Sequence, residues 1–332
     1  MDTYDVTAQP DSSDVTRIES YVIAVTGVLV VFCNILILLV CLKTDVIDRT
    51  HVNINFFYSL TCADLALGLG VLPLSFVTSR SSGWAFPVWM CDAQAYAAAY
   101  CWIVSLYSLM WLSIDHYVAV RKGDRYENIM TDTKALCWVL FTWFGALLYC
   151  CPPLLDIAHG RYYSEAFICV VDWKAQEAYL IISSILIAAP PAVAILVANA
   201  YVCTGGFKES AVQFEISSSR NSRPTAFIRN IIVASVFLLA WLPWMSMKVY
   251  EMMYAFSFGS TAHFVCMWLG VGNSLWKFVV YVCFDPDFRR GIAKLYLKTF
   301  RCRSPWSTER ISERPSSIYS VGGVSVISGS RY

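Results

Sequence analysis

Charged residues are scarce in this chain: they make up 15% of its 332 residues, whereas hydrophobic residues make up 57%. A soluble helical bundle needs polar faces on its helices, and most of the long apolar stretches here lack them. The four histidines are scattered, with no nucleophile or metal-ligand spacing beside them. The sequence therefore predicts neither a soluble domain nor an enzyme, and it indicates no metal, no cofactor and no nucleic-acid partner.

Two further features are missing. Residues 1–20 are acidic and polar without an apolar core, so no cleavable signal peptide is expected, and they contain no Asn-x-Ser/Thr acceptor for glycosylation. No internal repeat and no pair of broken helices is visible in the sequence, which argues against a transporter.

Seven apolar stretches dominate what is present. Each reaches the length of about 20 helical residues that crosses a hydrocarbon core of about 30 Å. They cover residues 21–42, 53–77, 91–120, 135–155, 179–201, 226–254 and 262–284. We therefore predict an all-α membrane protein, a bundle of seven transmembrane helices (spans one to seven).

Lysine and arginine cluster in alternate loops, namely those after spans one, three, five and seven. The opposite side has only Arg17, Arg80, Arg161 and Lys174. By the positive-inside rule, the N-terminus is expected outside and the C-terminus in the cytoplasm. The chain is thus expected to have an extracellular tail, a seven-helix domain, an amphipathic eighth helix and a disordered cytoplasmic tail. Their residues are 1–20, 21–284, 285–300 and 301–332.

Most of the thirteen cysteines lie within the spans or at their edges, where free thiols behave as small hydrophobes. Cys91 and Cys169 lie on the outer side, and two cysteines in an oxidising compartment are candidates for one disulfide. That bridge would hold the outer loop over the bundle. Cys302 follows a basic amphipathic stretch, which suits palmitoylation; an unmodified thiol is the alternative.

Polar groups within the spans need partners, because they are costly inside a bilayer. Asp64 of span two is therefore expected to face the bundle interior. Asn273, Lys277 and Tyr281 recur every four residues and share one face of span seven. We expect Lys277 to pair with Asp64; the alternative is that its ammonium snorkels to the membrane interface. Pro243 removes a backbone hydrogen bond in span six and permits a kink.

The motifs of this chain resemble those of the rhodopsin-like (class A) G-protein-coupled receptors, over about residues 20–300. The resemblance rests on the order and spacing of residues in all seven spans. They are Asn34, Leu60, Asp64, Trp84, Cys91, Asp115-His116-Tyr117, Trp143, Pro190-Pro191, Phe237, Trp241, Pro243, Asn273, Ser274, Tyr281 and Phe288. The resemblance implies a plasma-membrane receptor that transmits an extracellular signal to a heterotrimeric G protein.

The resemblance also implies roles for individual residues. Those expected to act in activation and G-protein coupling are Asp115, His116, Tyr117, Phe237, Pro243 and Tyr281. A buried polar network, whose counterpart in the family binds sodium, is expected to comprise Asn34, Asp64, Ser105, Asn273, Ser274 and Lys277.

Two positions depart from the family pattern. His116 replaces the arginine of Asp-Arg-Tyr, and imidazole has neither the reach nor the fork of a guanidinium. The inner end of span six offers Arg223 and no glutamate for an acidic lock, so we expect a loosely held off-state and weaker coupling. Lys277 replaces the asparagine beside the sodium-binding carboxylate, so its ammonium would take the place of the sodium ion.

A ligand is expected in an outer cavity. Mapped by spacing from Cys91, Ala98 stands where amine receptors carry an aspartate, so a biogenic amine is not expected. The candidate ligand-binding residues are Ala98, Trp102, Trp241, Trp244, Lys248, Phe264 and Trp268. Such a set suits a lipid-like ligand, with an acidic group for Lys248. The alternative is that the aromatic side chains fill the bundle themselves.

Two rival functions are a transporter and a retinal photoreceptor. Opsins carry their Schiff-base lysine on the seventh span, but nearer the outer side, where this chain has Val271.

Besides the G protein, the expected partners are membrane lipid, an unidentified extracellular ligand and arrestin. Arrestin would bind phosphorylated serines of the tail, for which a plain solvated tail is the alternative. The serines concerned are Ser307, Ser312, Ser316, Ser317 and Ser320.

Overall fold

A computed structural model describes most of the predicted spans. The described residues are 12–44, 53–81, 83–122, 125–150, 159–172, 181–182, 184–206, 223–254 and 256–301. The chain forms two units, residues 1–295 and 296–332, and the first contains the helical bundle. The serines and Cys302 of the predicted cytoplasmic tail lie outside the described residues.

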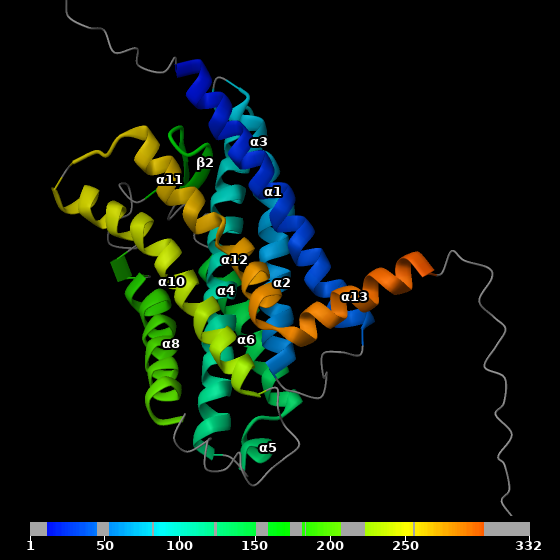
Figure 1. The fold of residues 1–332 in the computed structure, drawn as a ribbon. Helices are drawn as coiled ribbons and strands as arrows, with labels where there is room; N and C mark the ends of the chain where they lie inside the picture. Colours follow the sequence, from blue (N-terminus) through cyan, green and yellow to red (C-terminus); the bar gives the residue numbers. More distant parts are fainter. Residues whose placement is uncertain are drawn as a thin grey trace, which may run out of the picture. The chain divides into compact units, whose positions relative to one another are not determined.

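The first three spans are long helices. They are α1 (Ser12–Lys43), α2 (Asn53–Gly70) followed directly by α3 (Leu72–Ser79), and α4 (Val88–Lys122) (Figure 1). α1 begins at Ser12, so this helix includes the last part of the predicted N-terminal tail. Outside the hydrocarbon region a helix can continue with polar residues. The hydropathy of the sequence therefore marks the edge of the membrane core but not the end of the helix.

The fourth and fifth spans are shorter. α6 (Asp132–Tyr149) follows the short α5 (Tyr126–Ile129), and the Thr131 side chain caps α6 by accepting a hydrogen bond from the backbone N–H of Lys134. α8 (Ala189–Tyr201) is flanked by two π-helical turns. These turns are η3 (Ser184–Ala188) and η4 (Val202–Gly206). The Pro190-Pro191 pair lies in the first turn of α8, where a missing N–H costs little.

The sixth span is one continuous helix, and the seventh is divided into two helices. α10 (Arg223–Tyr254) carries Pro243 in its interior. α11 (Ser260–Val271) and α12 (Asn273–Phe284) meet at Gly272 with a bend of 46°. α13 (Pro286–Arg301) follows within two residues and matches the predicted eighth helix.

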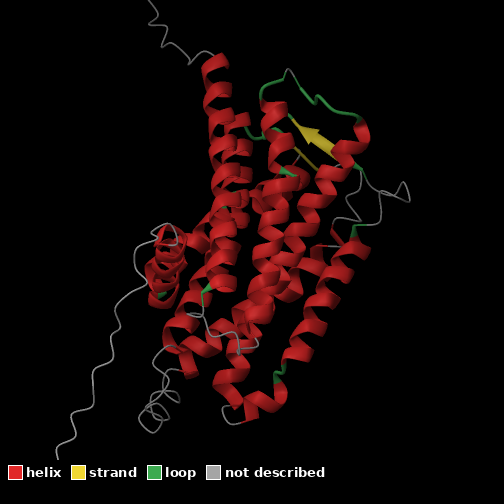
Figure 2. Ribbon diagram, turned by 90° about the vertical axis from the view of Figure 1, so that its right-hand side faces the viewer, coloured by secondary structure: helices red, strands yellow, loops and turns green. Residues whose placement is uncertain are grey.

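Most of these helices could span a membrane. Among the described residues, five helical spans are long and apolar enough to cross a membrane, and the bent α11–α12 pair gives a sixth. α6, with 18 residues, is not among these spans and packs with them as the seventh long helix. Large apolar side chains such as Phe32, Phe141 and Leu186 stay exposed on the outward faces, as lipid-facing positions do. With α6, the described part of the chain thus forms the predicted all-α seven-helix bundle. Figure 2 shows its helices packed side by side.

A small β-hairpin, which we did not predict, lies at one end of the bundle. β1 (Gly160–Tyr163) pairs antiparallel with β2 (Ile168–Val171), and Tyr162 stands opposite Cys169. Gly160 is needed there because a Cβ atom would lie 2.8 Å from the Cys91 carbonyl oxygen. The aromatic and β-branched residues on both sides of the turn were a signal for this hairpin.

Candidate functional site

One disulfide fixes the β-hairpin to α4. Cys91 and Cys169 are bonded, with a Cα–Cα distance of 5.4 Å, so the candidate disulfide is present. Two hydrogen bonds support it: the Gln94 Oε1 accepts from the Cys169 N–H at 2.9 Å, and the Asp92 carboxylate accepts from the Gly160 N–H at 2.6 Å. β2 is thereby held over the interior of the bundle.

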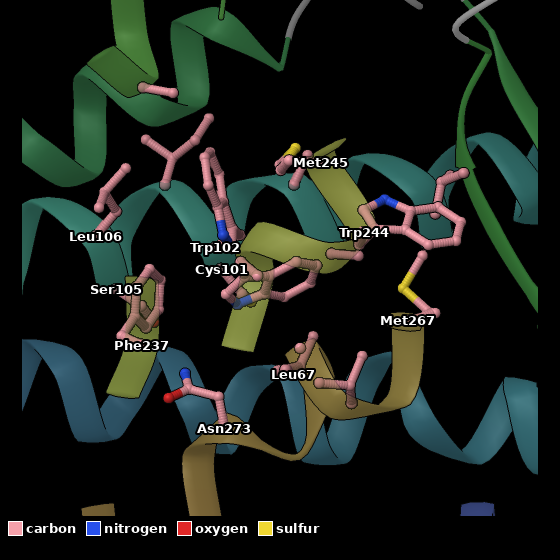
Figure 3. A pocket seen from close by; sticks show the side chains of 18 of the residues that line it. Leu67, Cys101, Trp102, Ser105, Leu106, Phe237, Trp244, Met245, Met267 and Asn273 are labelled. Carbon is pink, nitrogen blue, oxygen red and sulfur yellow. The ribbon is translucent and has the colours of Figure 1, made fainter. Parts of the chain in front are cut away.

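A cavity of about 470 Å³ lies beneath this hairpin. Its walls come from α4, α8, α10, α11 and β2, and Figure 3 shows Trp102, Phe237, Trp244 and Met267 around it. The volume lies within the range of about 300–1,000 Å³ that is usual for small-molecule sites. The aromatic side chains therefore leave the bundle interior partly open, contrary to the alternative that they fill it.

Four of the seven predicted ligand-binding residues line this cavity. They are Ala98, Trp102, Trp241 and Trp244. Trp241 is fixed from behind, because Gly270 of α11 lies so close that a Cβ atom would meet the indole at 2.8 Å. The indole also makes an edge contact with Trp102, at 6.1 Å between ring centroids.

Lys248 does not line the cavity. Its Nζ donates to the Glu251 carboxylate at 2.9 Å, and the other oxygen of that carboxylate lies 2.8 Å from His263 Nε2. The same ammonium stacks on the rings of Tyr163 and Trp244, at 4.4 and 4.6 Å. Burial raises the pKa of Tyr163 to about 12, so its phenol stays neutral. The predicted role of Lys248 as a counter-ion for an acidic ligand therefore has no support in this geometry.

Phe264 and Trp268 also do not line the cavity. Both belong to one hydrophobic cluster with Met247 and Val271. Trp268 donates from Nε1 to the Ala166 carbonyl oxygen at 3.0 Å and so anchors the β-hairpin turn to α11. For these two residues, the alternative that the aromatics serve packing agrees with the geometry.

A buried ion pair lies below the cavity floor. Lys277 Nζ is 2.7 Å from Asp64 Oδ2 and 3.3 Å from Thr61 Oγ1, and only 3% of the lysine side chain is exposed. An ammonium this deeply buried does not snorkel, and its distance from Asp64 agrees with the expected pairing. Asp64 itself reaches the cavity lining together with Ser105, Asn273 and Ser274.

Asn34 stands apart from this group. Its Nδ2 donates to the Val30 carbonyl oxygen of its own helix at 2.9 Å, and its Oδ1 is buried with no hydrogen-bond partner among the described residues. The structure therefore brings Asp64 and Lys277 together by direct bonds, and leaves Asn34 of the predicted polar network bonded within α1.

The Asp115-His116-Tyr117 motif lies near the other end of α4. Asp115 accepts a hydrogen bond from the Tyr126 hydroxyl of α5 at 2.6 Å. The His116 ring is buried against Phe227 of α10, with 4.9 Å between ring centroids, and its Nδ1 has no hydrogen-bond partner among the described residues. Tyr117 makes an edge contact with Tyr201, also at 4.9 Å. The three neighbours thus contact three different elements.

The other residues predicted to act in activation lie on α10 and α12. Phe237 lies between the cavity and the core cluster at this end of the bundle. Pro243 is one residue from Trp244 of the cavity wall, so the helix lacks one backbone hydrogen bond beside the cavity. Tyr281 is buried against Phe57 and Phe288, at 4.9 and 5.6 Å between ring centroids.

An ion pair that the sequence reasoning missed lies beside His116. Arg229 of α10 is bonded to Asp285, the residue between α12 and α13, and its guanidinium lies 4.3 Å from the centre of the Tyr281 ring. In the sequence, Arg229 is one of the basic residues that follow span five and indicate the topology. A basic residue inside an apolar helix, with an acidic residue just after span seven, was the available signal.

Comparison with known proteins agrees with this architecture. The family model of the seven-transmembrane receptors of the rhodopsin family matches residues 33–281. The alpha-1D adrenergic receptor of Rattus norvegicus is 27% identical over 75% of this chain and 51% of its own length. Trace amine-associated receptor 9 of Mus musculus is 25% identical over 85% of this chain and 86% of its own length.

The matches show the family but not a whole-protein equivalent. The chain spans about half the length of the adrenergic receptors that it matches. The matched residues extend from just before Asn34, the first residue of the predicted polar network, to Tyr281, the last residue predicted to act in activation. The resemblance found in the sequence is confirmed, and the family is one of receptors. This chain belongs to the rhodopsin family of seven-transmembrane receptors.

Proposed function

We propose that this chain is a multi-pass plasma-membrane receptor with an extracellular N-terminus. It relays an extracellular signal to a heterotrimeric G protein, and its ligand is an uncharged, apolar molecule rather than a biogenic amine. The distribution of lysine and arginine supports the orientation. With that orientation, the disulfide-bonded β-hairpin and the cavity lie on the outer side, and His116 and Arg229 lie on the cytoplasmic side.

The observation that carries the ligand class is the charge of the cavity. Asp64 is the one carboxylate among the described residues that line it, and Lys277 already neutralises that carboxylate at 2.7 Å. A ligand cation would enter an apolar site without a free counter-ion, and desolvating an unpaired charge costs several kcal/mol. The cavity therefore favours a neutral ligand, bound mainly through Trp102, Trp241 and Trp244.

The names of the relatives point to amines, and this chain differs from that expectation. The adrenergic and trace amine-associated receptors are named for amine ligands. At the position where the resemblance places an amine-binding aspartate, this chain has Ala98, and Ala98 lines the cavity. A methyl group there supplies space and apolar surface but no counter-ion.

Ala98→Phe is expected to abolish ligand-dependent signalling, because the added ring occupies the cavity. Ala93→Phe is the matched control, since Ala93 is exposed on the same helix outside the cavity. The thermal stability of the purified protein is measured in the presence of noradrenaline, phenethylamine or one of two neutral lipids, a monoacylglycerol and a sterol. A bound neutral lipid at a hundredfold excess over its Kd stabilises the wild type by about 2.7 kcal/mol. The same lipid leaves Ala98→Phe unchanged.

The amine probes are the contrary arm of this experiment. Stabilisation by noradrenaline or phenethylamine that Ala98→Phe removes and Ala93→Phe retains would overturn the assignment of a neutral ligand. A neutral lipid that stabilises both variants equally would place its binding outside the cavity.

His116→Arg is expected to raise G-protein activation by about fivefold at equal surface level, the lower end of usual coupling energies. Arginine restores a permanent, forked cation, and His116→Gln is the matched control because it changes size without adding charge. The measurement is a second-messenger panel for each G-protein class. Equal activation by the arginine variant and the wild type would show that His116 does not limit coupling.

The rival functions have less support. A retinal photoreceptor needs a lysine in the ligand cavity, whereas Lys277 is absent from the cavity lining and is bonded to Asp64. An absorbance band in the visible after addition of retinal would favour that function. Arrestin binding through the serine-rich tail stays a prediction, since those serines lie outside the described residues.

A further inference from the structure

Arg229 is a partly buried cation at the proposed cytoplasmic end of α10. Its side chain is 19% exposed, and that of its partner Asp285 is 8% exposed. Burial of a guanidinium in this setting is costly unless it is paired and bonded, so the contact with Asp285 largely determines where the Arg229 side chain lies.

Asp285 uses its two oxygens for different tasks. Oδ1 accepts from the backbone N–H groups of Asp287 and Phe288, at 2.9 and 3.0 Å, and thereby caps the start of α13. Oδ2 binds the Arg229 guanidinium. The carboxylate is therefore fixed by α13, and through it Arg229 ties α10 to the junction of α12 and α13.

Two further contacts hold Arg229 at this junction. Its guanidinium lies over the Tyr281 ring of α12 at 4.3 Å, a cation–π geometry. The next residue, Asn230, donates from Nδ2 to Ser113 Oγ of α4 at 3.4 Å. This part of α10 thus contacts α4, α12 and the start of α13 together.

His116 does not take part in this set of bonds. A small cavity of about 60 Å³ is lined by His116, Arg229, Asn230, Tyr281 and Asp285. His116 Nδ1 and Arg229 Nε are both buried there without a hydrogen-bond partner among the described residues. The arginine that lines this small cavity comes from α10, whereas the resemblance places an arginine on α4 at position 116.

We propose that Arg229 is a positioning residue that holds the cytoplasmic end of α10 against the α12–α13 junction in the non-signalling state. An outward movement of α10 must break the bond to Asp285 and the stacking on Tyr281 together. This proposal rests on the proposed signalling function for its consequence, whereas the tie itself is a property of this bundle. This contact would stabilise the non-signalling state, which the sequence predicted to be only weakly stabilised.

Arg229→Gln and Asp285→Asn are each expected to raise ligand-independent G-protein activation by about fivefold or more at equal surface level. Asp285→Asn keeps the side-chain oxygen that caps α13 and removes only the charge. The double variant, Arg229→Gln with Asp285→Asn, breaks the same contact and should raise activation no further than either single variant. Arg290→Gln is the control, since it breaks an exposed ion pair with Asp287 on the same α13.

A second readout does not depend on a G protein. Fluorophores attached through azide-bearing residues at Ile228 and Phe284, both exposed, report the separation of α10 and α12 in purified protein. We expect a larger separation in Arg229→Gln and the wild-type value in Arg290→Gln. Larger separation without any G-protein activation would support the tie and overturn the proposed function. If the single variants match Arg290→Gln in both readouts, Arg229 does not hold α10.

Discussion

Asp64→Asn and Lys277→Asn are each expected to lower the free energy of unfolding by about 3–5 kcal/mol, because each leaves an uncompensated buried charge. The two side chains are bonded at 2.7 Å and are 7% and 3% exposed. The double variant removes both charges and should recover most of the loss. Denaturation of the purified protein in detergent measures all three, and Lys294→Asn, at an exposed position, should stay within about 0.5 kcal/mol of the wild type.

Sodium provides a second test of the same pair. Lys277→Asn leaves Asp64, Ser105, Asn273 and Ser274 around a site with an unpaired carboxylate. The stability of this single variant should therefore rise with sodium concentration, whereas the wild type should be insensitive because the ammonium already supplies the charge. Additive losses in the double variant, with no sodium response in the single one, would contradict an energetic coupling of Asp64 and Lys277.

The spans were predictable because each depends on local composition alone. A stretch of about 20 apolar residues crosses a membrane whatever its neighbours are. The bend of 46° at Gly272 was less accessible, since the apolar pattern runs through it. The β-hairpin was missed although its aromatic and β-branched residues were a signal, because its strands have only four residues each.

In the candidate site, the features that follow from the cost of burying a charge were predictable. The features that depend on how the helices pack against one another were not. The pairing of Lys277 with Asp64 followed from the cost of a charge inside a bilayer, which leaves few choices of partner. The ligand-binding role suggested for Lys248 has no support in the geometry, because its ammonium is paired with Glu251, a carboxylate that also lies against His263. The contact with His263 depends on how α10 packs against α11. The partner of Arg229 depends likewise on how α10 meets the α12–α13 junction, which no single segment specifies.

Removal of the disulfide is the other change with a large expected effect. Cys91 and Cys169 are 78 residues apart in the sequence, and cross-linking a loop of that length stabilises by about 4.5 kcal/mol in the chain-entropy model. Ile168, Val170 and Val171 of β2 line the cavity, so release of the β-hairpin also removes part of the cavity wall. Cys91→Ser and Cys169→Ser should therefore each lower stability and weaken ligand binding.

The pattern among variants separates this bond from other cysteine effects. Because the two residues form one bond, the double variant Cys91→Ser with Cys169→Ser should lose no more stability than either single variant. Cys137→Ser is the matched control, since Cys137 is free and exposed. Thermal melts give the losses, and mass spectrometry of non-reduced peptides from surface-expressed protein should show the cross-link. Both thiols free in that protein, or additive losses in the double variant, would contradict a single structural bridge. The hydrogen bonds that Asp92 and Gln94 accept from Gly160 and Cys169 should keep the hairpin partly in place, so residual ligand binding is expected in all three variants.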